Sequence, residues 1–184
     1  LTLSYTRAML STLLFNATPR RLLLLGLGGG ALAKFLLHHL PDCRIDAVEY
    51  RESVYQLARA YFHLPDDPRL SMYFADAADF IRREDATHGG YDLILVDAFT
   101  ADGVAHATSN LSFFDACRTR LAGNGVLAAN LWAADSIKLE DIISDLGDAF
   151  DGRLLRLPVD GKANVIALTT QQGKLGHGFV LSSA

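Results

Sequence analysis

A run of glycines and three acidic residues each come directly after an apolar stretch of the sequence. In an open α/β sheet, ligands bind beyond the carboxyl ends of the strands, so residues that follow separate strands can converge on one ligand. Bare backbone and carboxylates at such an edge suit a ligand with hydroxyl groups, amino groups and positive charge. The glycines are Gly26, Gly28 and Gly30, and the acids are Glu49, Asp76 and Asp97.

The glycine run has the spacing G-x-G-x-G and lies between four leucines and a helical pattern. Glycines at this place let the backbone turn sharply and approach a ligand closely. The following helix offers free N–H groups and the positive end of its dipole. This pattern predicts a nucleoside-binding loop.

Each acid has a role that its position suggests. Glu49 lies about twenty residues beyond the glycines, the distance at which a carboxylate accepts the hydroxyls of a ribose. The neighbouring Tyr50 could stack near the ribose or the adenine. Asp76 and Ala77 are placed to bind the exocyclic amino group of adenine. Asp97 would lie beside the middle of the ligand, where chemistry would occur.

The elements that hold these residues alternate between buried strands and amphipathic helices. Such repeated units favour a mostly parallel sheet with helices on both faces. A turn with Asp160 and Gly161 joins the last two strands as a hairpin, which adds an antiparallel strand. The predicted strands are residues 22–25, 44–49, 70–74, 91–96, 126–131, 153–157 and 165–169. The predicted helices are residues 31–40, 52–63, 76–83, 112–121 and 137–150.

Three segments fall outside this alternation. Residues 123–125, Gly-Asn-Gly, are expected to stop the fourth helix, and residues 173–184 to fray or join the sheet late. Residues 100–110 carry no secondary-structure signal and lie at the predicted ligand edge, where long loops often act as lids. Trp132 follows the fifth strand and could line a site for a second substrate.

Composition narrows the function further. The chain has 184 residues, half of them hydrophobic, and a net charge of −4, which suits one globular domain over residues 1–184. We expect no nucleic-acid partner, because the sequence lacks a basic stripe. No apolar run approaches the ~20 residues of a membrane span, and no signal peptide is visible, so we expect a cytoplasmic protein. Cys43 and Cys117 are expected to be reduced and buried, and no Cys/His cluster has metal-binding spacing.

The glycines alone leave two kinds of nucleoside open. In a dinucleotide fingerprint the third glycine would come one residue later, and Ala31 occupies that place. NAD is therefore not excluded by the loop. The antiparallel pair after five α/β strands fits the sheet of S-adenosylmethionine (AdoMet)-dependent transferases better, and that sheet needs only one nucleoside site.

Over most of its length, from about Pro19 to Leu131, the sequence resembles the spermidine synthase (polyamine aminopropyltransferase) family. Tyr5 and Met9, ahead of the first strand, resemble the family's Tyr-containing first helix. The matching segments are PRRLLLLGLGGG, AVEY, DDPRLSMYFADAADFI, YDLILVDAF and SFFDACRTRLAGNGVLAANL. Each of these segments also has a counterpart in AdoMet methyltransferases.

The resemblance implies a Rossmann-like AdoMet-methyltransferase fold and a role for each site residue. The three glycines would hold the nucleoside side of AdoMet or decarboxylated AdoMet, Glu49 its ribose, and Asp76 with Ala77 its adenine. Asp97 would be the first acid of the family's D-x-x-D motif, the general base. The acceptor would be a small amine, and a homodimer is possible. Residues 1–20 leave little room for the family's N-terminal β domain.

Two positions depart from the family pattern. Gly29 stands where the family has an aspartate that holds the donor's propylamine. Thr100 stands where the family has the second acid of D-x-x-D, although Asp102 could replace it through a shift of the loop. Three interpretations remain open: an aminopropyltransferase with altered amine specificity, an AdoMet-dependent methyltransferase, and a non-catalytic nucleoside-binding protein.

Overall fold

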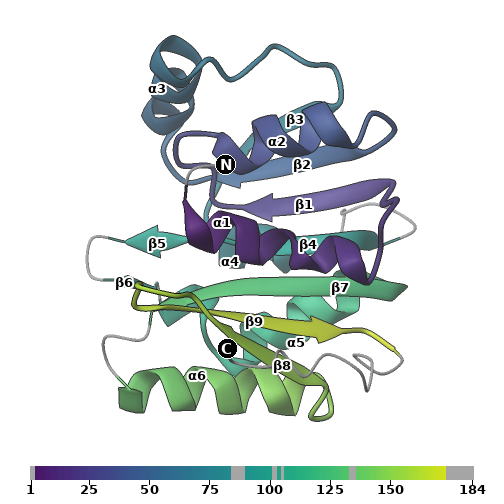
Figure 1. The fold of residues 1–184 in the computed structure, drawn as a ribbon, viewed down its shortest axis with the longest axis vertical. Coiled ribbons are helices and arrows are strands. Elements are labelled where there is room, and N and C mark those ends of the chain that lie inside the picture. The colour runs from purple at the N-terminus through teal and green to yellow at the C-terminus, as the bar shows by residue number, and fades with distance from the viewer. Residues whose placement is uncertain (1–2, 84–89, 101–102, 105, 133–135, 173–184) are drawn as a thin grey trace.

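The computed structural model describes residues 3–83, 90–100, 103–104, 106–132 and 136–172. Seven of its strands form one sheet. These are β1 (Arg21–Leu25), β2 (Arg44–Glu49), β3 (Leu70–Phe74), β4 (Tyr91–Val96), β7 (Leu121–Trp132), β8 (Leu154–Pro158) and β9 (Asn164–Thr170). Their order across the sheet is β3-β2-β1-β4-β7-β9-β8 (Figure 1).

Strand direction follows the sequence-based prediction. The pairs from β3 to β7 are parallel, β9 runs antiparallel to β7, and β8 pairs antiparallel with β9. The turn between β8 and β9 contains Gly161 at a positive φ of 66°, as its hairpin sequence indicated. A mostly parallel sheet with an antiparallel last strand is confirmed.

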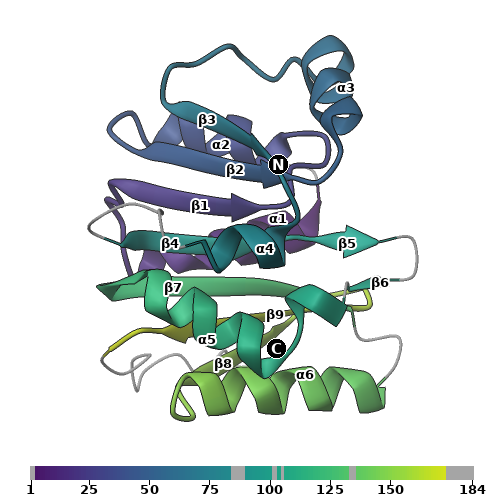
Figure 2. The same cartoon turned by 180° about the vertical axis from the view of Figure 1, so that it is seen from behind.

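Helices cover both faces of the sheet. They are α1 (Ser4–Met9), α2 (Ala31–His39), α3 (Glu52–Phe62), α4 (Ala77–Ile81), α5 (Leu111–Arg120) and α6 (Ser136–Ala149), with short 3₁₀ turns η1 (Leu10–Leu14) and η2 (His106–Thr108). Figure 1 shows α1 and α2 in front of the sheet, and Figure 2 shows α4 and α5 in front of the opposite face. Buried side chains of α3 join the first of these cores and those of α6 join the second.

Strand β1 shows how one apolar run supplies both cores. Leu22 and Leu24 pack with α2 on one face, whereas Leu23 and Leu25 pack with α4 and α5 on the other. All four are completely buried, because β1 lies between β2 and β4 with helices on both sides. A continuous apolar strand is therefore what this position in the sheet requires.

Helix α5 ends at Arg120, one residue before the predicted end, but residues 123–125 do not separate it from the next strand, which was expected to begin at residue 126. These residues lie inside β7, which begins at Leu121, directly after α5. The pairing of β4 with β7 shifts register between Tyr91 and Leu93. A Cβ atom on Gly125 would come within 2.7 Å of the Tyr91 carbonyl oxygen, so glycine permits the close approach of the two strands.

The predicted absence of secondary structure over residues 100–110 is also wrong. Two short strands, β5 (Phe99–Thr100) and β6 (Gly103–Val104), pair antiparallel, and η2 follows them. Each strand has only two residues, which is too short for a periodic pattern to reveal. Residues 173–184, for which we expected a frayed end or a late strand, lie outside the described part of the chain.

Two smaller expectations concern the cysteines and the membrane. Cys43 and Cys117 are both free and buried, as predicted. Burial raises the pKa of the Cys43 thiol to about 11, which keeps it protonated at neutral pH. Within the described ranges, no helix is both long and apolar enough to cross a bilayer.

Candidate functional site

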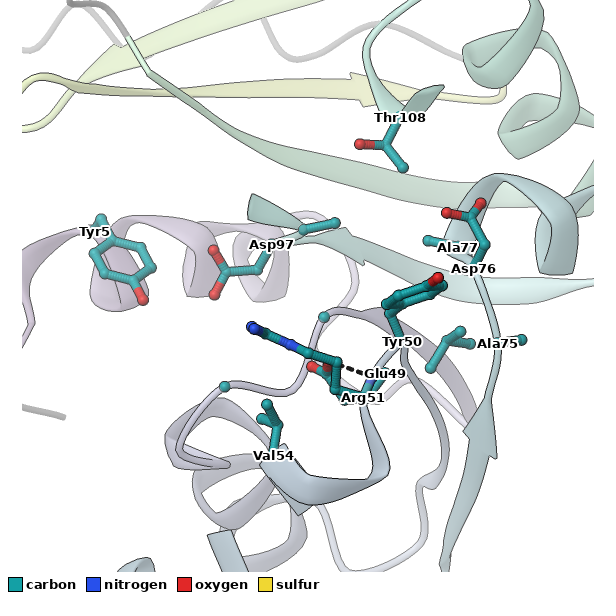
Figure 3. A pocket seen from close by; sticks show the side chains of 14 residues that line it. Tyr5, Glu49, Tyr50, Arg51, Val54, Ala75, Asp76, Ala77, Asp97 and Thr108 are labelled. Carbon is teal, nitrogen blue, oxygen red and sulfur yellow. Dashed lines mark hydrogen bonds between the residues drawn. The ribbon is translucent and has the colours of Figure 1, made fainter. Parts of the chain in front are cut away.

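A cavity of about 640 Å³ opens where β1, β2, β3 and β4 end (Figure 3). In this sheet β1 continues to β2 on one side and pairs with β4 on the other, so chain connections leave β1 and β4 in opposite directions. Such a switch point is where open α/β sheets bind their ligands. Seven of the predicted site residues line the cavity: Gly26, Gly28, Glu49, Tyr50, Asp76, Ala77 and Asp97.

The glycine loop is built from positions with different demands. Gly26 has a φ of 97°, and a Cβ atom there would lie 2.3 Å from the Asp97 carbonyl oxygen. Gly26 therefore lets the loop pass against the end of β4. Gly28 also has a positive φ, 51°, but a Cβ atom there would meet nothing within 4 Å. It is thus bare backbone facing open space in the cavity wall, as a closely approaching ligand needs.

Two backbone N–H groups hold the carboxylate of Glu49. Leu27 N donates to its Oε2 at 3.2 Å, and Arg51 N donates to its Oε1 at 3.1 Å. The side chain is buried at the end of β2 and is fixed between the glycine loop and the start of α3. A carboxylate oxygen can accept more than one hydrogen bond. Each oxygen therefore retains capacity for a ligand hydroxyl.

Asp76 serves as the N-cap of α4 and also lines the cavity. Its Oδ1 accepts hydrogen bonds from Ala78 N at 2.8 Å and Asp79 N at 3.1 Å. Figure 3 shows Asp76 and Ala77 on one side of the cavity, with the ring of Tyr50 beside them. Tyr50 is 74 % exposed, so a planar ligand has access to it.

Asp97 follows β4 and lies on another side of the cavity, near Tyr5 (Figure 3). Asn130 Nδ2 donates to its Oδ1 at 2.9 Å. Desolvation raises the pKa of Asp97 to about 6, although hydrogen bonds from Asn130 and Tyr5 act in the opposite direction. Burial and the charge of Asp97 raise the pKa of Tyr5 to about 12, so its hydroxyl stays a donor. Asp97 is ionised at pH 7 but binds a proton more readily than an ordinary aspartate.

Other predicted residues lie elsewhere. Gly30 is the N-cap residue of α2, with a φ of 72°, and it faces Leu64 rather than the cavity. A Cβ atom on Gly29 would face the ring of Phe62 at 3.4 Å. Trp132 ends β7 and is 46 % exposed, but it is not part of the cavity wall.

Two predicted substrate-side residues fall where the side chains are not described. Thr100 lies in β5, of which only the backbone is described. Asp102 lies outside the described residues. Their roles stay predictions.

Sequence reasoning missed several residues that the fold brings to the site. Arg51 and Thr108 line the cavity, and Asn130 bonds to Asp97 from β7. Arg51 follows Tyr50 directly after β2, so its position at a strand end was a usable signal. Asn130 lies inside an apolar strand, where a lone polar residue indicates a buried hydrogen bond. Thr108 carried no signal.

The sheet order and the cavity at its switch point define a Rossmann-like α/β protein of the methyltransferase fold class. Human methyltransferase-like protein 13, solved in complex with SAH, superposes with a TM-score of 0.87 at 26 % identity, over 95 % of this chain and 86 % of that one. A spermidine synthase in complex with the transition-state analogue AdoDATO has a TM-score of 0.78 at 18 % identity, over 92 % of this chain and 61 % of that one, and shows the shared fold.

The chain belongs to the spermine/spermidine synthase family, whose domain matches residues 3–145. The polyamine aminopropyltransferase of Chromobacterium violaceum is 36 % identical over 173 residues, which cover 94 % of this chain and 65 % of that relative. An eEF1A lysine and N-terminal methyltransferase of Mus musculus is 30 % identical over 158 residues, 81 % of this chain and 22 % of that protein. The chain thus spans 65 % of the aminopropyltransferase and a smaller part of the methyltransferase.

Proposed function

We propose that this protein transfers an aminopropyl group from decarboxylated AdoMet to a small amine, with Asp97 as the general base. Family membership and the name of the Chromobacterium violaceum relative support this reaction. The nucleoside would bind with its ribose at Glu49 and its adenine at Asp76 and Ala77. The observation that carries the proposal is that Asp97 shares one cavity with these groups and has a pKa raised to about 6.

The reaction needs a base because its acceptor binds as an ammonium ion. An amine with a Lys-like pKa of about 10.4 costs roughly 5 kcal/mol to deprotonate at pH 7. The ionised Asp97 stabilises this ammonium and accepts its proton. The free lone pair attacks the carbon next to the sulfonium, the carbon–sulfur bond breaks, and neutral methylthioadenosine leaves. A base with a pKa near 6 accepts the proton more favourably than one near 4.

The variant Asp97→Asn tests this role. It keeps the size of the side chain but cannot accept the proton. We expect transfer from decarboxylated AdoMet to putrescine, propane-1,3-diamine or spermidine to fall at least 100-fold, as is typical for loss of a general base. Binding of methylthioadenosine, measured by calorimetry, should stay within a few-fold. Asp115→Asn is the matched control, since Asp115 is exposed on α5.

Two results would contradict the proposal. Unchanged turnover in Asp97→Asn would remove this residue from the mechanism. No transfer by the unaltered protein to any of the three amines, together with tight binding of methylthioadenosine, would leave a nucleoside-binding protein with another reaction or none.

Arg51 favours a second candidate, methyl transfer from intact AdoMet. Its guanidinium lines the cavity, and the structure shows no salt bridge to it from any residue it describes. Figure 3 shows the side chain extending from the Glu49 end of the cavity toward the side of Tyr5 and Asp97. A cation there would attract the carboxylate of AdoMet and repel the propylamine of the decarboxylated donor. Gly29, in place of the family's aspartate, supplies no opposing charge.

Calorimetry separates the two donors. S-adenosylhomocysteine carries the carboxylate and methylthioadenosine lacks it. If Arg51 binds the carboxylate, Arg51→Gln should weaken S-adenosylhomocysteine at least tenfold, about 1.4 kcal/mol, and leave methylthioadenosine unchanged. Arg44→Gln, at the far end of β2 and exposed, is the control. Equal losses for both ligands, or none, would count against methyl transfer.

A further inference from the structure

Two buried asparagines form a chain of hydrogen bonds that ends on Asp97. Asn164 Nδ2, on β9, donates to Asn130 Oδ1 at 2.9 Å. Asn130 Nδ2, on β7, donates to Asp97 Oδ1, also at 2.9 Å. Asn130 is 3 % exposed and Asn164 is 8 % exposed, so bulk water has little access to either amide.

The direction of the Asn130 amide decides how it acts on Asp97. An amide presents either an NH₂ donor or a carbonyl acceptor, and its neighbours select the orientation. With its NH₂ group on Asp97, it favours the ionised carboxylate. Turned over, its carbonyl would favour a protonated Asp97, which could donate to it. These two states correspond to a free base and an occupied base.

The position of Asn164 selects between the two orientations of the Asn130 amide. Its NH₂ group faces the Asn130 oxygen, which matches only the orientation with the Asn130 NH₂ group on Asp97. If Asn130 turned over, its NH₂ group would meet the NH₂ group of Asn164, and two donors would face each other without an acceptor. Leaving buried donors unpaired is unfavourable, so Asn130 does not turn over unless Asn164 turns with it.

We propose that Asn164 is a positioning residue, which holds the amide of Asn130 in the orientation that donates to Asp97. The inference rests on the proposed function, in which Asp97 accepts the acceptor's proton. Asn164 acts from the antiparallel strand β9, two hydrogen bonds away from the base. The strand that closes the sheet therefore contributes to the chemistry without touching the cavity.

Few other groups in the described residues act on Asp97. Tyr5, on α1, lies near it in the cavity wall, and its hydroxyl and the amide of Asn130 both lower the pKa of Asp97 against the effect of desolvation. Glu49, Arg51 and Asp76 are the remaining charged residues of the cavity wall. Strand β7 presents Asn130, and the loop after β1 presents glycines. Changes at Asn164 should thus reach Asp97 through Asn130.

The test measures protonation of Asp97 directly. In protein with ¹³C-labelled aspartate, the Asp97 carboxyl resonance is assigned with Asp97→Asn and followed against pH. Asn130→Leu removes the donor to Asp97 and should raise its proton affinity at least tenfold, about one pKa unit. Asn164→Leu leaves Asn130 in place but frees it to turn over. We expect a rise in the same direction, at least threefold, about half a unit.

Thr170→Val is the control for packing. Thr170 lies on β9 and is buried like Asn164, but its hydroxyl has no hydrogen-bond partner among the described residues. It should leave the Asp97 titration unchanged. A wild-type titration in Asn164→Leu, with the Asn130→Leu titration shifted, would overturn the role of Asn164. An unshifted titration in Asn130→Leu would overturn the whole chain of bonds.

A measurement on the unaltered protein covers the case in which the leucine variants do not fold. The side-chain NH₂ resonances of Asn130 and Asn164 should both move with the midpoint of the Asp97 titration, and those of Asn130 should move more. The proposal would be contradicted if the NH₂ resonances of Asn130 and Asn164 did not change with pH around this midpoint. The titrations need no turnover, so their result is independent of the proposed function. If the titration is shifted in Asn164→Leu but the pH profile of kcat/KM, measured separately, is unchanged, then Asn164 positions Asn130 and Asp97 is not the base.

Discussion

Desolvation of the Asp97 carboxyl raises its pKa from 3.8 to about 6, so the folded protein binds a proton there more tightly than the unfolded chain. A group with a raised pKa contributes stability below its unfolded pKa, and this contribution is lost as the pH rises through the folded value. At neutral pH the ionised Asp97 therefore lowers the free energy of unfolding. A destabilising carboxylate in a cavity wall is typical of a functional site.

The variant Asp97→Asn should consequently be more stable than the original protein at pH 7.5, by about 1–3 kcal/mol. The advantage should shrink as the pH falls from 6 to 4, since the Asp97 side chain of the folded original protein is then protonated and as uncharged as the asparagine. Urea unfolding of the two proteins at pH 7.5 and at pH 4 measures this difference in stability. A variant that is less stable at pH 7.5 would show that the hydrogen bonds to Asn130 and Tyr5 outweigh desolvation.

Glu49 differs from Asp97 because two backbone donors already hold its carboxylate. Glu49→Gln would place an NH₂ group against the N–H group of either Leu27 or Arg51. We expect the affinity for methylthioadenosine to fall at least tenfold, about 1.4 kcal/mol, with a loss of stability of about 1–3 kcal/mol from the unpaired donors. Calorimetry and urea unfolding measure the two effects. Unchanged affinity would place the ribose elsewhere.

The sequence indicated the acids of the site but not their support. Glu49, Asp76 and Asp97 were visible because each directly follows an apolar strand. Asn164 was invisible because its role depends on β9 lying beside β7, a pairing between segments far apart in the chain. Tyr5 was noted only through a family resemblance, since a tyrosine in a short helix has no pattern of its own.

Among the elements, the glycine loop contains one glycine needed mainly for stability, Gly26, and one beside open space in the ligand cavity, Gly28. A Cβ atom on Gly26 would overlap the backbone at Asp97, whereas one on Gly28 would enter open space. Both have positive φ values, which cost an alanine roughly 1–2 kcal/mol. Gly28→Ala should therefore cost about that much stability and weaken methylthioadenosine, because Gly28 lines the cavity.

Gly26→Ala should cost more, about 3–5 kcal/mol, because the backbone at the end of β4 must also shift. Thermal unfolding of the two variants gives the comparison. Equal losses of stability in both would mean that the loop does not approach Asp97 as closely as the structure shows.

Strands and helices with long patterns were predictable, and short or interrupted ones were not. Strands β2, β3 and β4 have the predicted bounds, although β3, at the edge of the sheet, is largely exposed. The Gly-Asn-Gly segment resembles a stop, but it lies inside β7 because glycine allows close contact with β4. The two-residue strands β5 and β6 depend on each other and on no local pattern.

At the scale of the whole molecule, alternation of strands and helices predicted a parallel sheet, but not the order of its strands. Order depends on which strands meet after collapse, and many orders satisfy the same pattern. The observed order puts the switch point between β1 and β4, directly below the cavity. The site is therefore a consequence of topology as much as of local sequence.

Because the cavity wall draws on α1, the glycine loop, β2, α3, α4 and η2, a nucleoside bound there should tie together elements from both sides of β1. At a concentration of 100 times its Kd, methylthioadenosine should stabilise the fold by about 2.7 kcal/mol, which raises Tm by roughly 5–10 °C for a chain of this size. Hydrogen exchange should slow in residues 26–30 and 49–54 and stay unchanged in the β8–β9 hairpin.

A second hollow, of about 540 Å³, lies between α6 and β8 and includes Glu140, Asp148 and Arg156. Methylthioadenosine could instead slow hydrogen exchange around this second hollow and stabilise Glu49→Gln as much as the original protein. The nucleoside would then bind away from Asp97, and the proposed reaction could not take place there.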